Sequence, residues 1–140
     1  MFLLDTVAIS ETQRATMDPA MEAFYASITS DSLFLSVVSI GELHFGLNLM
    51  PAGKRREALR EWVVGVEESF ADRILGIDEQ VGRKWGELRA DIRKHGYAIE
   101  FNDLLIAATA LHHDLTVVTR NVKDFAPTGC KLFNPWETAL

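Results

Sequence analysis

Short apolar runs alternate with longer segments of helical periodicity from one end of the chain to the other. Within the longer segments, apolar side chains recur three and four positions apart, which is typical of helices with one buried face. Because strands and helices alternate, the pattern predicts an α/β fold in three layers, with a central parallel sheet flanked by helices. The candidate strands are Phe2–Leu4, Leu33–Val38, Arg73–Ile77, Leu115–Thr119 and Lys131–Phe133.

Capping signals locate several helix starts. Asp18 followed by Pro19 predicts one of them, because aspartate caps a helix and proline suits its first turn. Ser39 with Glu42 three positions later is the capping-box pattern, which predicts that a helix begins there. Asp78 is a further candidate cap, ahead of a segment with a clear apolar stripe.

Composition narrows the class of protein. The 140 residues are 48% hydrophobic and 24% charged, which suits one soluble globular domain spanning residues 1–140. The net charge of -6 argues against broad, sequence-independent nucleic-acid binding. It is compatible with a local basic patch or with a site built from carboxylates.

Cysteine usage and the N-terminus predict a reducing compartment. The one cysteine, Cys130, excludes an intrachain disulfide and a cysteine-based zinc site, and it predicts a reduced, partly buried thiol. The apolar start ends at Asp5, so no signal peptide is expected. No apolar run approaches the roughly 20 residues that span a bilayer. We therefore expect a cytoplasmic protein without membrane attachment.

Four acids map to the same edge of the predicted sheet. Asp5 follows the first strand, and Asp124 lies in the polar turn after the fourth. Glu42 and Asp103 stand in the first turns of helices that open toward that edge. Each acid also has a simpler interpretation, as a helix cap, a capping-box partner or a turn residue, with Asn102 as the cap ahead of Asp103. Together they favour a bound Mg²⁺ or Mn²⁺, because gathered carboxylates repel each other and these ions take oxygen ligands.

A site of this kind hydrolyses a phosphodiester with metal-activated water, so it needs no protein nucleophile, and none is evident. The histidines at 44, 95, 112 and 113 lack metal-ligand spacing, and neither a P-loop nor a glycine-rich dinucleotide motif is present. A receiver-type phosphoacceptor domain also gathers acids around Mg²⁺ in an α/β fold. It requires an acid pair after its first strand, where Asp5 stands alone.

Several segments in a fixed order identify a family more specifically than any one of them alone. They are LLDT at 3–6, LSVVSIGELHFG at 35–46, FADRILGID at 70–78, WGELRADIRKHG at 85–96, DLLIAATAL at 103–111, LTVVTRNVKDF at 115–125 and NPWE at 134–137. Over nearly its whole length the chain resembles PIN-domain ribonuclease toxins of the VapC/FitB type.

The resemblance implies a single PIN domain over residues 1–140 and a Mg²⁺- or Mn²⁺-dependent endoribonuclease that cleaves tRNA or other structured RNA. It also implies a cognate antitoxin of the VapB/FitA type, which blocks the site. Further implications are a homodimer, a toxin–antitoxin hetero-oligomer, and contact with operator DNA only through the antitoxin.

The family's metal-site acids match Asp5, Glu42 and Asp103. The fourth acidic position falls in the TRNVKDF segment, where either Asp124 or Asn121 fills it. The resemblance also implies that the hydroxyl groups of Thr6 and Thr119 support the site.

One position departs from the family pattern. The family usually reads Asp-Thr-Asn at the end of its first strand, and Val7 replaces the asparagine here. A polar side chain that could orient Asp5 or a water is lost, which predicts reduced turnover. The alternative function is therefore a catalytically weakened PIN-fold protein that acts mainly through antitoxin binding and operon repression.

Basic side chains are the candidate contacts to RNA phosphates. They are Lys54, Arg55, Arg56, Arg83, Lys84 and Arg120. Those at 54–56 stand in the first turn of a predicted helix over 54–70, where positive charge opposes the helix dipole. That cost favours a separate task for these charges, although a solvated helix face is the simpler interpretation.

Overall fold

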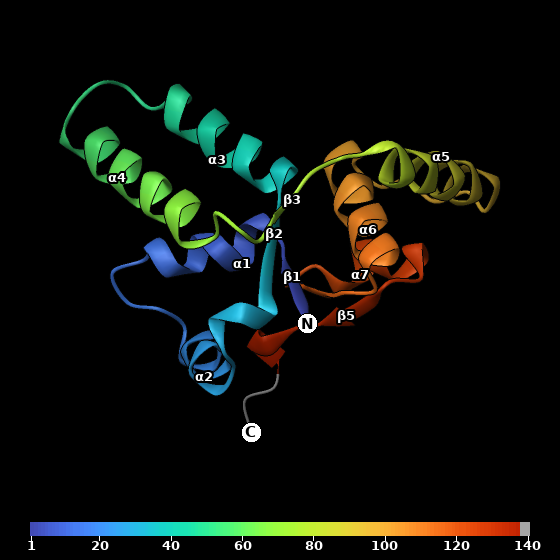
Figure 1. The fold of residues 1–140 in the computed structure, drawn as a ribbon, viewed down its shortest axis with the longest axis horizontal. Coiled ribbons are helices and arrows are strands. Elements are labelled where there is room, and N and C mark those ends of the chain that lie inside the picture. The colour runs from blue at the N-terminus through green and yellow to red at the C-terminus, as the bar shows by residue number, and fades with distance from the viewer. Residues whose placement is uncertain (138–140) are drawn as a thin grey trace.

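A five-stranded parallel sheet forms the centre of the molecule in a computed structural model, which describes residues 1–137 (Figure 1). The last three positions of the predicted 1–140 domain lie outside the described residues. The strand order is β3-β2-β1-β4-β5. The strands are β1 (Phe2–Leu4), β2 (Leu33–Ser36), β3 (Ile74–Leu75), β4 (Thr116–Val118) and β5 (Lys131–Phe133). The predicted parallel α/β sheet is confirmed. β1 and β5 have the predicted bounds, whereas β2, β3 and β4 are shorter than the apolar runs suggested.

Helices cover both faces of this sheet, α1 to α4 on one side and α5 to α7 on the other (Figure 1). They are α1 (Thr6–Ser10), α2 (Pro19–Ser27), α3 (Val37–Leu49), α4 (Lys54–Ser69), α5 (Glu79–Lys94), α6 (Phe101–His113) and α7 (Val122–Phe125). This is the predicted three-layer arrangement. Within residues 1–137, none of the helices has the length and apolar character needed to span a bilayer.

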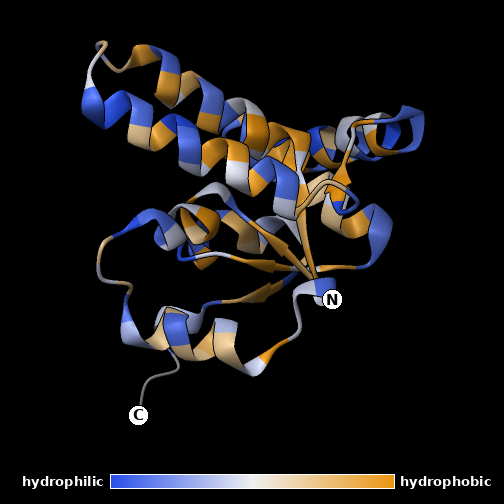
Figure 2. Ribbon diagram, turned by 60° about the vertical axis from the view of Figure 1, so that its left-hand side comes forward, coloured by the Kyte–Doolittle hydropathy of each residue, from blue (hydrophilic) through white to orange (hydrophobic). Residues whose placement is uncertain are grey.

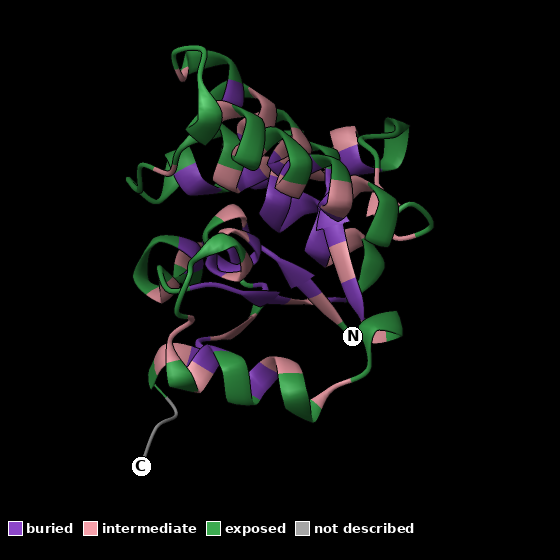
Figure 3. Cartoon of the chain, turned by 90° about the vertical axis from the view of Figure 1, so that its left-hand side faces the viewer, coloured by how far each residue is buried: buried purple, intermediate pink, exposed green. Residues whose placement is uncertain are grey.

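The core divides into two clusters because successive strand residues point to opposite faces of the sheet. Leu4 and Val118 pack against α1, α2 and α4, whereas Leu3 and Val117 pack against α5 and α6. The helices turn their hydrophobic sides toward the sheet (Figure 2), and the strands are largely buried between the helical layers (Figure 3). Cys130 is a buried free thiol in the second cluster, as predicted.

The start of α3 differs from the sequence prediction. The apolar run from 33 to 38 was expected to be one strand, but β2 ends at Ser36, whose hydroxyl accepts a hydrogen bond from the Val38 N–H at 3.0 Å. Ser36 is therefore the helix cap, and the predicted capping box of Ser39 and Glu42 is wrong because both lie inside the helix. The predicted caps at 18 and 78 are confirmed.

β1 is the point of the sheet from which successive strands are added first on one side and then on the other. The chain passes from β1 to β2 and β3 on one side, then returns to place β4 and β5 on the other. In open parallel sheets, connections leave the two sides of such a switch point in opposite directions, and a crevice opens at the carboxyl ends of the strands. Asp5 follows β1 and Thr119 follows β4, so both residues stand at this crevice.

Candidate active site

Asp5 stands between β1 and α1 and is held by several hydrogen bonds. Its Oδ1 accepts a bond from the Ala8 N–H at 2.8 Å, which makes Asp5 the cap of α1. The side chain is only 5% exposed, and this burial raises the pKa of the carboxyl group. Hydrogen bonds from the Thr119 hydroxyl and the Ala8 N–H oppose that rise. Asp5 is thus a rigidly placed carboxylate, and the Thr119 hydroxyl contacts it.

Glu42 faces Asp5 from the neighbouring helix. It lies in the second turn of α3 rather than the first, because the helix begins earlier than predicted. Its Oε1 accepts a hydrogen bond from the Thr6 hydroxyl at 2.6 Å, within the short range of charge-assisted bonds. Its negative charge contributes to the raised pKa of Asp5, so the two acids lie within electrostatic reach of each other.

Asp103 brings a carboxyl group from the opposite helical layer. It is half-buried in the first turn of α6, as predicted, although Glu100 and not Asn102 precedes the helix as its cap residue. Burial, and after it repulsion by Glu100, Glu42, Asp5 and Asp124, together raise the pKa of Asp103 to about 6. Glu100 is an acid beside the site that the sequence did not lead us to predict. Its position one helical turn before Asp103 is the signal that could have identified it.

The fourth acidic position lies in the turn between β4 and α7. Asn121 and Asp124 are both exposed there, and the Asp124 N–H donates to the Asn121 carbonyl oxygen at 3.1 Å. The Asn121 N–H in turn donates to the Thr119 hydroxyl at 2.9 Å, which ties the turn to the residue that contacts Asp5. Asp124 acts on the pKa of Asp103. Asp124 and Asn121 stay alternatives for this position.

The acids at this edge have the oxygen ligands that a hard divalent cation prefers. The acids supply oxygen atoms alone, and their mutual repulsion is what a cation would relieve. Among residues 1–137, however, no three histidine, cysteine or acidic side chains are gathered closely enough to hold a metal ion as they stand. Binding an ion would therefore require one of the less buried acids, Asp103 or Asp124, to turn toward Asp5 and Glu42. A cavity of about 650 Å³, lined by Thr6, Glu42 and Asn102 among others, opens beside them.

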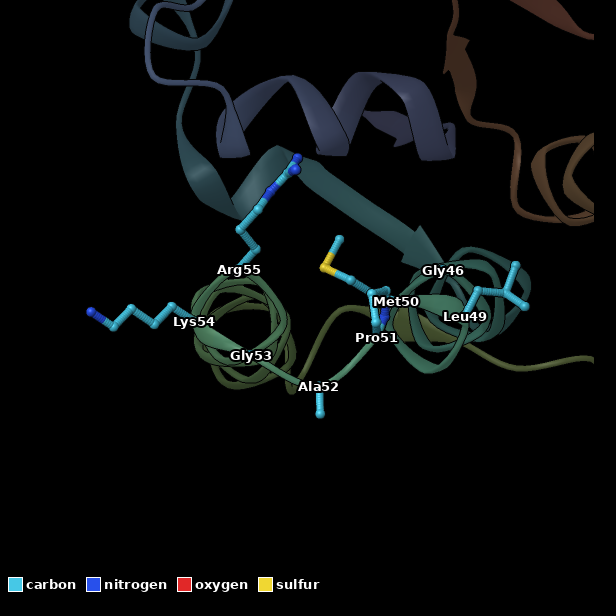
Figure 4. A pocket seen from close by; sticks show the side chains of 8 residues that line it. All are labelled: Gly46, Leu49, Met50, Pro51, Ala52, Gly53, Lys54 and Arg55. Carbon is cyan, nitrogen blue, oxygen red and sulfur yellow. The ribbon is translucent and has the colours of Figure 1, made fainter.

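The basic residues at the start of α4 are far from these acids. Lys54 and Arg55 line a pocket at the turn between α3 and α4, together with Met50 and Gly53 (Figure 4). Because a helix rises about 1.5 Å per residue, this turn lies about 12 Å along α3 from Glu42. The sheet edge thus gathers the acids, while these predicted RNA contacts stand at the other end of the α3–α4 hairpin.

The other basic candidates differ in how far they are engaged. Three have partners on their own or the adjacent helix: Arg56 with Asn48 at 3.4 Å, Arg83 with Glu79 at 3.9 Å, and Lys84 with Glu87 at 3.7 Å. Arg120 directly follows Thr119 at the sheet edge, and its guanidinium lies 5.1 Å from the centre of the Trp136 ring. Of the six, Arg120 is the one that adjoins an acid-contacting residue in the chain.

Comparison with known proteins agrees with this geometry. The PIN domain family matches residues 2–128. The chain is 39% identical over 140 residues to the VapC ribonuclease Y4jK of Sinorhizobium fredii, covering 99% of this chain and 100% of that protein. It is 37% identical over 140 residues to the toxin FitB of Neisseria gonorrhoeae, covering 97% and 99%.

The fold is also similar to those of solved structures. A structure of FitAB bound to an IR36 DNA fragment has a TM-score of 0.93 and 34% identity, covering 100% of this chain and 99% of that one. Matches of this extent, together with the parallel sheet and the acids at its carboxyl edge, leave one assignment. The chain belongs to the PIN-domain family and, within it, is of the VapC and FitB toxin type.

Proposed function

We propose that this chain is the toxin of a toxin–antitoxin pair, that it acts as a single domain over residues 1–140, and that it cleaves RNA as a divalent-metal-dependent endoribonuclease. The observation that carries the proposal is the meeting of acids from separate segments at one sheet edge, where Glu42, Asp5 and Asp124 all act electrostatically on the half-buried Asp103. The relatives named VapC ribonuclease and toxin FitB support the same reading.

Asp5, Glu42 and Asp103 are the proposed ligands of a Mg²⁺ or Mn²⁺ ion, with Asp124 or Asn121 in the fourth position. An ion held there would lower the pKa of a water that attacks the phosphodiester. The chain's own residues prepare the site: the Ala8 N–H and the Thr119 hydroxyl orient Asp5, and the Thr6 hydroxyl orients Glu42.

Substrate approach depends on charge around the acids. The proposed substrate is tRNA or another structured RNA, and its phosphates need basic side chains close to the sheet edge. Arg120 suits this task, because it follows Thr119 and its guanidinium lies over the Trp136 ring. The basic turn at Lys54 and Arg55 would contact RNA only at a distance from the site of cleavage.

A small antitoxin is the proposed protein partner. The FitAB relative supports a complex of this kind, and its bound DNA supports operator contact through the antitoxin. Large apolar side chains on the surface support protein contacts, including a homodimer: Phe45 is 68% exposed, Leu49 69% and Phe101 57%. Val64 on α4 is also exposed, at 46%.

The first prediction is that purified, antitoxin-free protein cleaves tRNA only with Mg²⁺ or Mn²⁺. We expect 5′-phosphate and 3′-hydroxyl ends, loss of cleavage in excess EDTA, and recovery when Mn²⁺ is added back. Gel analysis of end-labelled RNA measures both the rate and the ends. Equal rates of cleavage with and without EDTA would contradict the proposed metal dependence, since hydrolysis by metal-activated water stops without the ion.

Val7 favours a second candidate function. Its side chain is 44% exposed in the first turn of α1, next to Asp5, and offers no polar group there. If the protein binds Mn²⁺ and antitoxin but leaves RNA intact, it is a binding protein that acts through antitoxin and operator. The same cleavage assay therefore separates the enzyme from its alternative.

A further inference from the structure

Three oxygen atoms from two helices form a connected chain beside the acids. The Thr6 hydroxyl oxygen lies 2.6 Å from Glu42 Oε1 and 3.0 Å from the Ser39 hydroxyl oxygen. Ser39 is fully buried, and Thr6 is the hydrogen-bond partner of its side chain in the described part of the molecule. Ser39 and Glu42 stand one turn apart on the face of α3 that meets α1.

Hydrogen counting fixes the direction of this chain. Thr6 has one hydroxyl hydrogen, and an ionised carboxylate accepts hydrogen bonds without donating any. The 2.6 Å contact is in the range of a charge-assisted bond, whereas 3.0 Å is long for neutral hydroxyl groups. The Thr6 hydrogen therefore points to Glu42. Ser39 then donates its own hydrogen to the Thr6 oxygen, so both bonds run toward the carboxylate.

We infer that Ser39 is a positioning residue for the metal site, acting on Glu42 through Thr6. This inference rests on the proposed function, because it assigns Glu42 to the metal. A hydroxyl that accepts one hydrogen bond donates a stronger one, so Ser39 strengthens the hold of Thr6 on Glu42 Oε1. That hold limits the rotation of the Glu42 carboxylate, whose oxygen atoms would bind a cation.

The location of Thr6 gives the chain a second consequence. Thr6 follows Asp5 directly, so the Ser39–Thr6–Glu42 chain couples the first residue of α1 to a side chain on α3. The positions of Asp5 and Glu42, which belong to separate segments, are thereby coupled to each other. Residues that orient a ligand from behind typically change metal affinity by about 10- to 100-fold when removed.

The test is Mn²⁺ binding without RNA, measured by calorimetry on the full chain. Ser39→Ala removes the hydroxyl with little loss of volume, and we expect affinity for Mn²⁺ to fall about tenfold. Thr6→Val should lower it at least as much, while Thr6→Ser keeps the hydroxyl and should retain affinity. Thr109→Val is the matched control, since it removes a buried hydroxyl whose partner is the Leu105 carbonyl oxygen.

A double-mutant cycle separates positioning from a structural role. If Ser39 acts through Glu42, Ser39→Ala should change Mn²⁺ affinity in the wild type but not in a Glu42→Gln background. An unchanged affinity in Ser39→Ala, or the same loss in both backgrounds, would overturn the inference. The thermal midpoint in EDTA identifies any variant that fails to fold. A wild-type chain that binds no Mn²⁺ would instead contradict the proposed function.

Discussion

Asp103→Asn is expected to lower the rate of RNA cleavage by at least about 100-fold, because a bound metal contributes several kcal/mol to phosphodiester hydrolysis and each 1.36 kcal/mol is a factor of ten. Asparagine keeps the shape of the side chain and removes its charge. The rate is measured with saturating Mg²⁺ on the RNA that the wild type cleaves. Undiminished cleavage would exclude Asp103 as a metal ligand.

The same variant is expected to be more stable than the wild type when metal is absent. The folded chain raises the pKa of Asp103 from its ordinary value of 3.8 to about 6, so between these values the folded state holds a proton that the unfolded chain has released. The free energy of unfolding therefore falls as pH rises through this range. Asparagine stays neutral at every pH and avoids that loss.

The gain is expected to be about 1 kcal/mol near pH 7, after discounting the shift because Asp103 is only half-buried, and to vanish below about pH 4. Urea unfolding in EDTA at both pH values measures it. Asp31→Asn is the control, because it makes the same change in net charge in the turn before β2, at the other edge of the sheet. A destabilised Asp103→Asn at pH 7 would contradict the electrostatic account.

Two substitutions of Asp5 are expected to distinguish its role in catalysis from its role in folding. Asp5→Asn retains an oxygen that can accept the Ala8 N–H, so α1 stays capped, but it removes the carboxylate. We expect cleavage to fall at least about 100-fold without a loss of unfolding free energy, because asparagine keeps the cap and removes a carboxyl group whose pKa is raised by burial. Asp5→Ala should lose the same activity and in addition about 1 kcal/mol of stability from the missing cap.

Asp18 provides the matched control for this pair. It caps α2 through the Ala20 N–H at 2.8 Å, just as Asp5 caps α1. Asp18→Ala should therefore cost similar stability, while Asp18→Asn and Asp18→Ala both leave cleavage intact. If Asp5→Asn cleaves RNA at the wild-type rate, Asp5 is a structural cap and the metal assignment fails there.

The sequence predicts the layer order and the edge at which the acids lie, for a physical reason. Short apolar runs that alternate with helices favour a parallel sheet, because the helices then cover both of its faces. The carboxyl ends of the strands in such a sheet lie at the same edge. Asp5 at the end of β1 and Asp103 in the first turn of α6 are therefore found where the pattern predicts.

The sequence does not predict how the segments meet in detail. Periodicity cannot separate a buried strand from the start of a buried helix, so the sequence predicts a strand that runs to Val38, although Val37 and Val38 begin α3. The bond between Thr6 and Glu42 joins residues 36 positions apart and depends on the packing of α1 against α3. That contact is a product of tertiary structure, and so is the burial that raises the pKa of Asp103.

Anomalous diffraction from crystals of this chain soaked in Mn²⁺ tests the central claim most directly. The account predicts a manganese peak at the carboxyl edge of β1 and β4, within coordination distance of oxygen atoms of Asp5, Glu42 and Asp103. Coordination to these hard oxygen ligands is expected at about 2.0 to 2.6 Å. A peak at other residues, or none at concentrations that support cleavage, would contradict it.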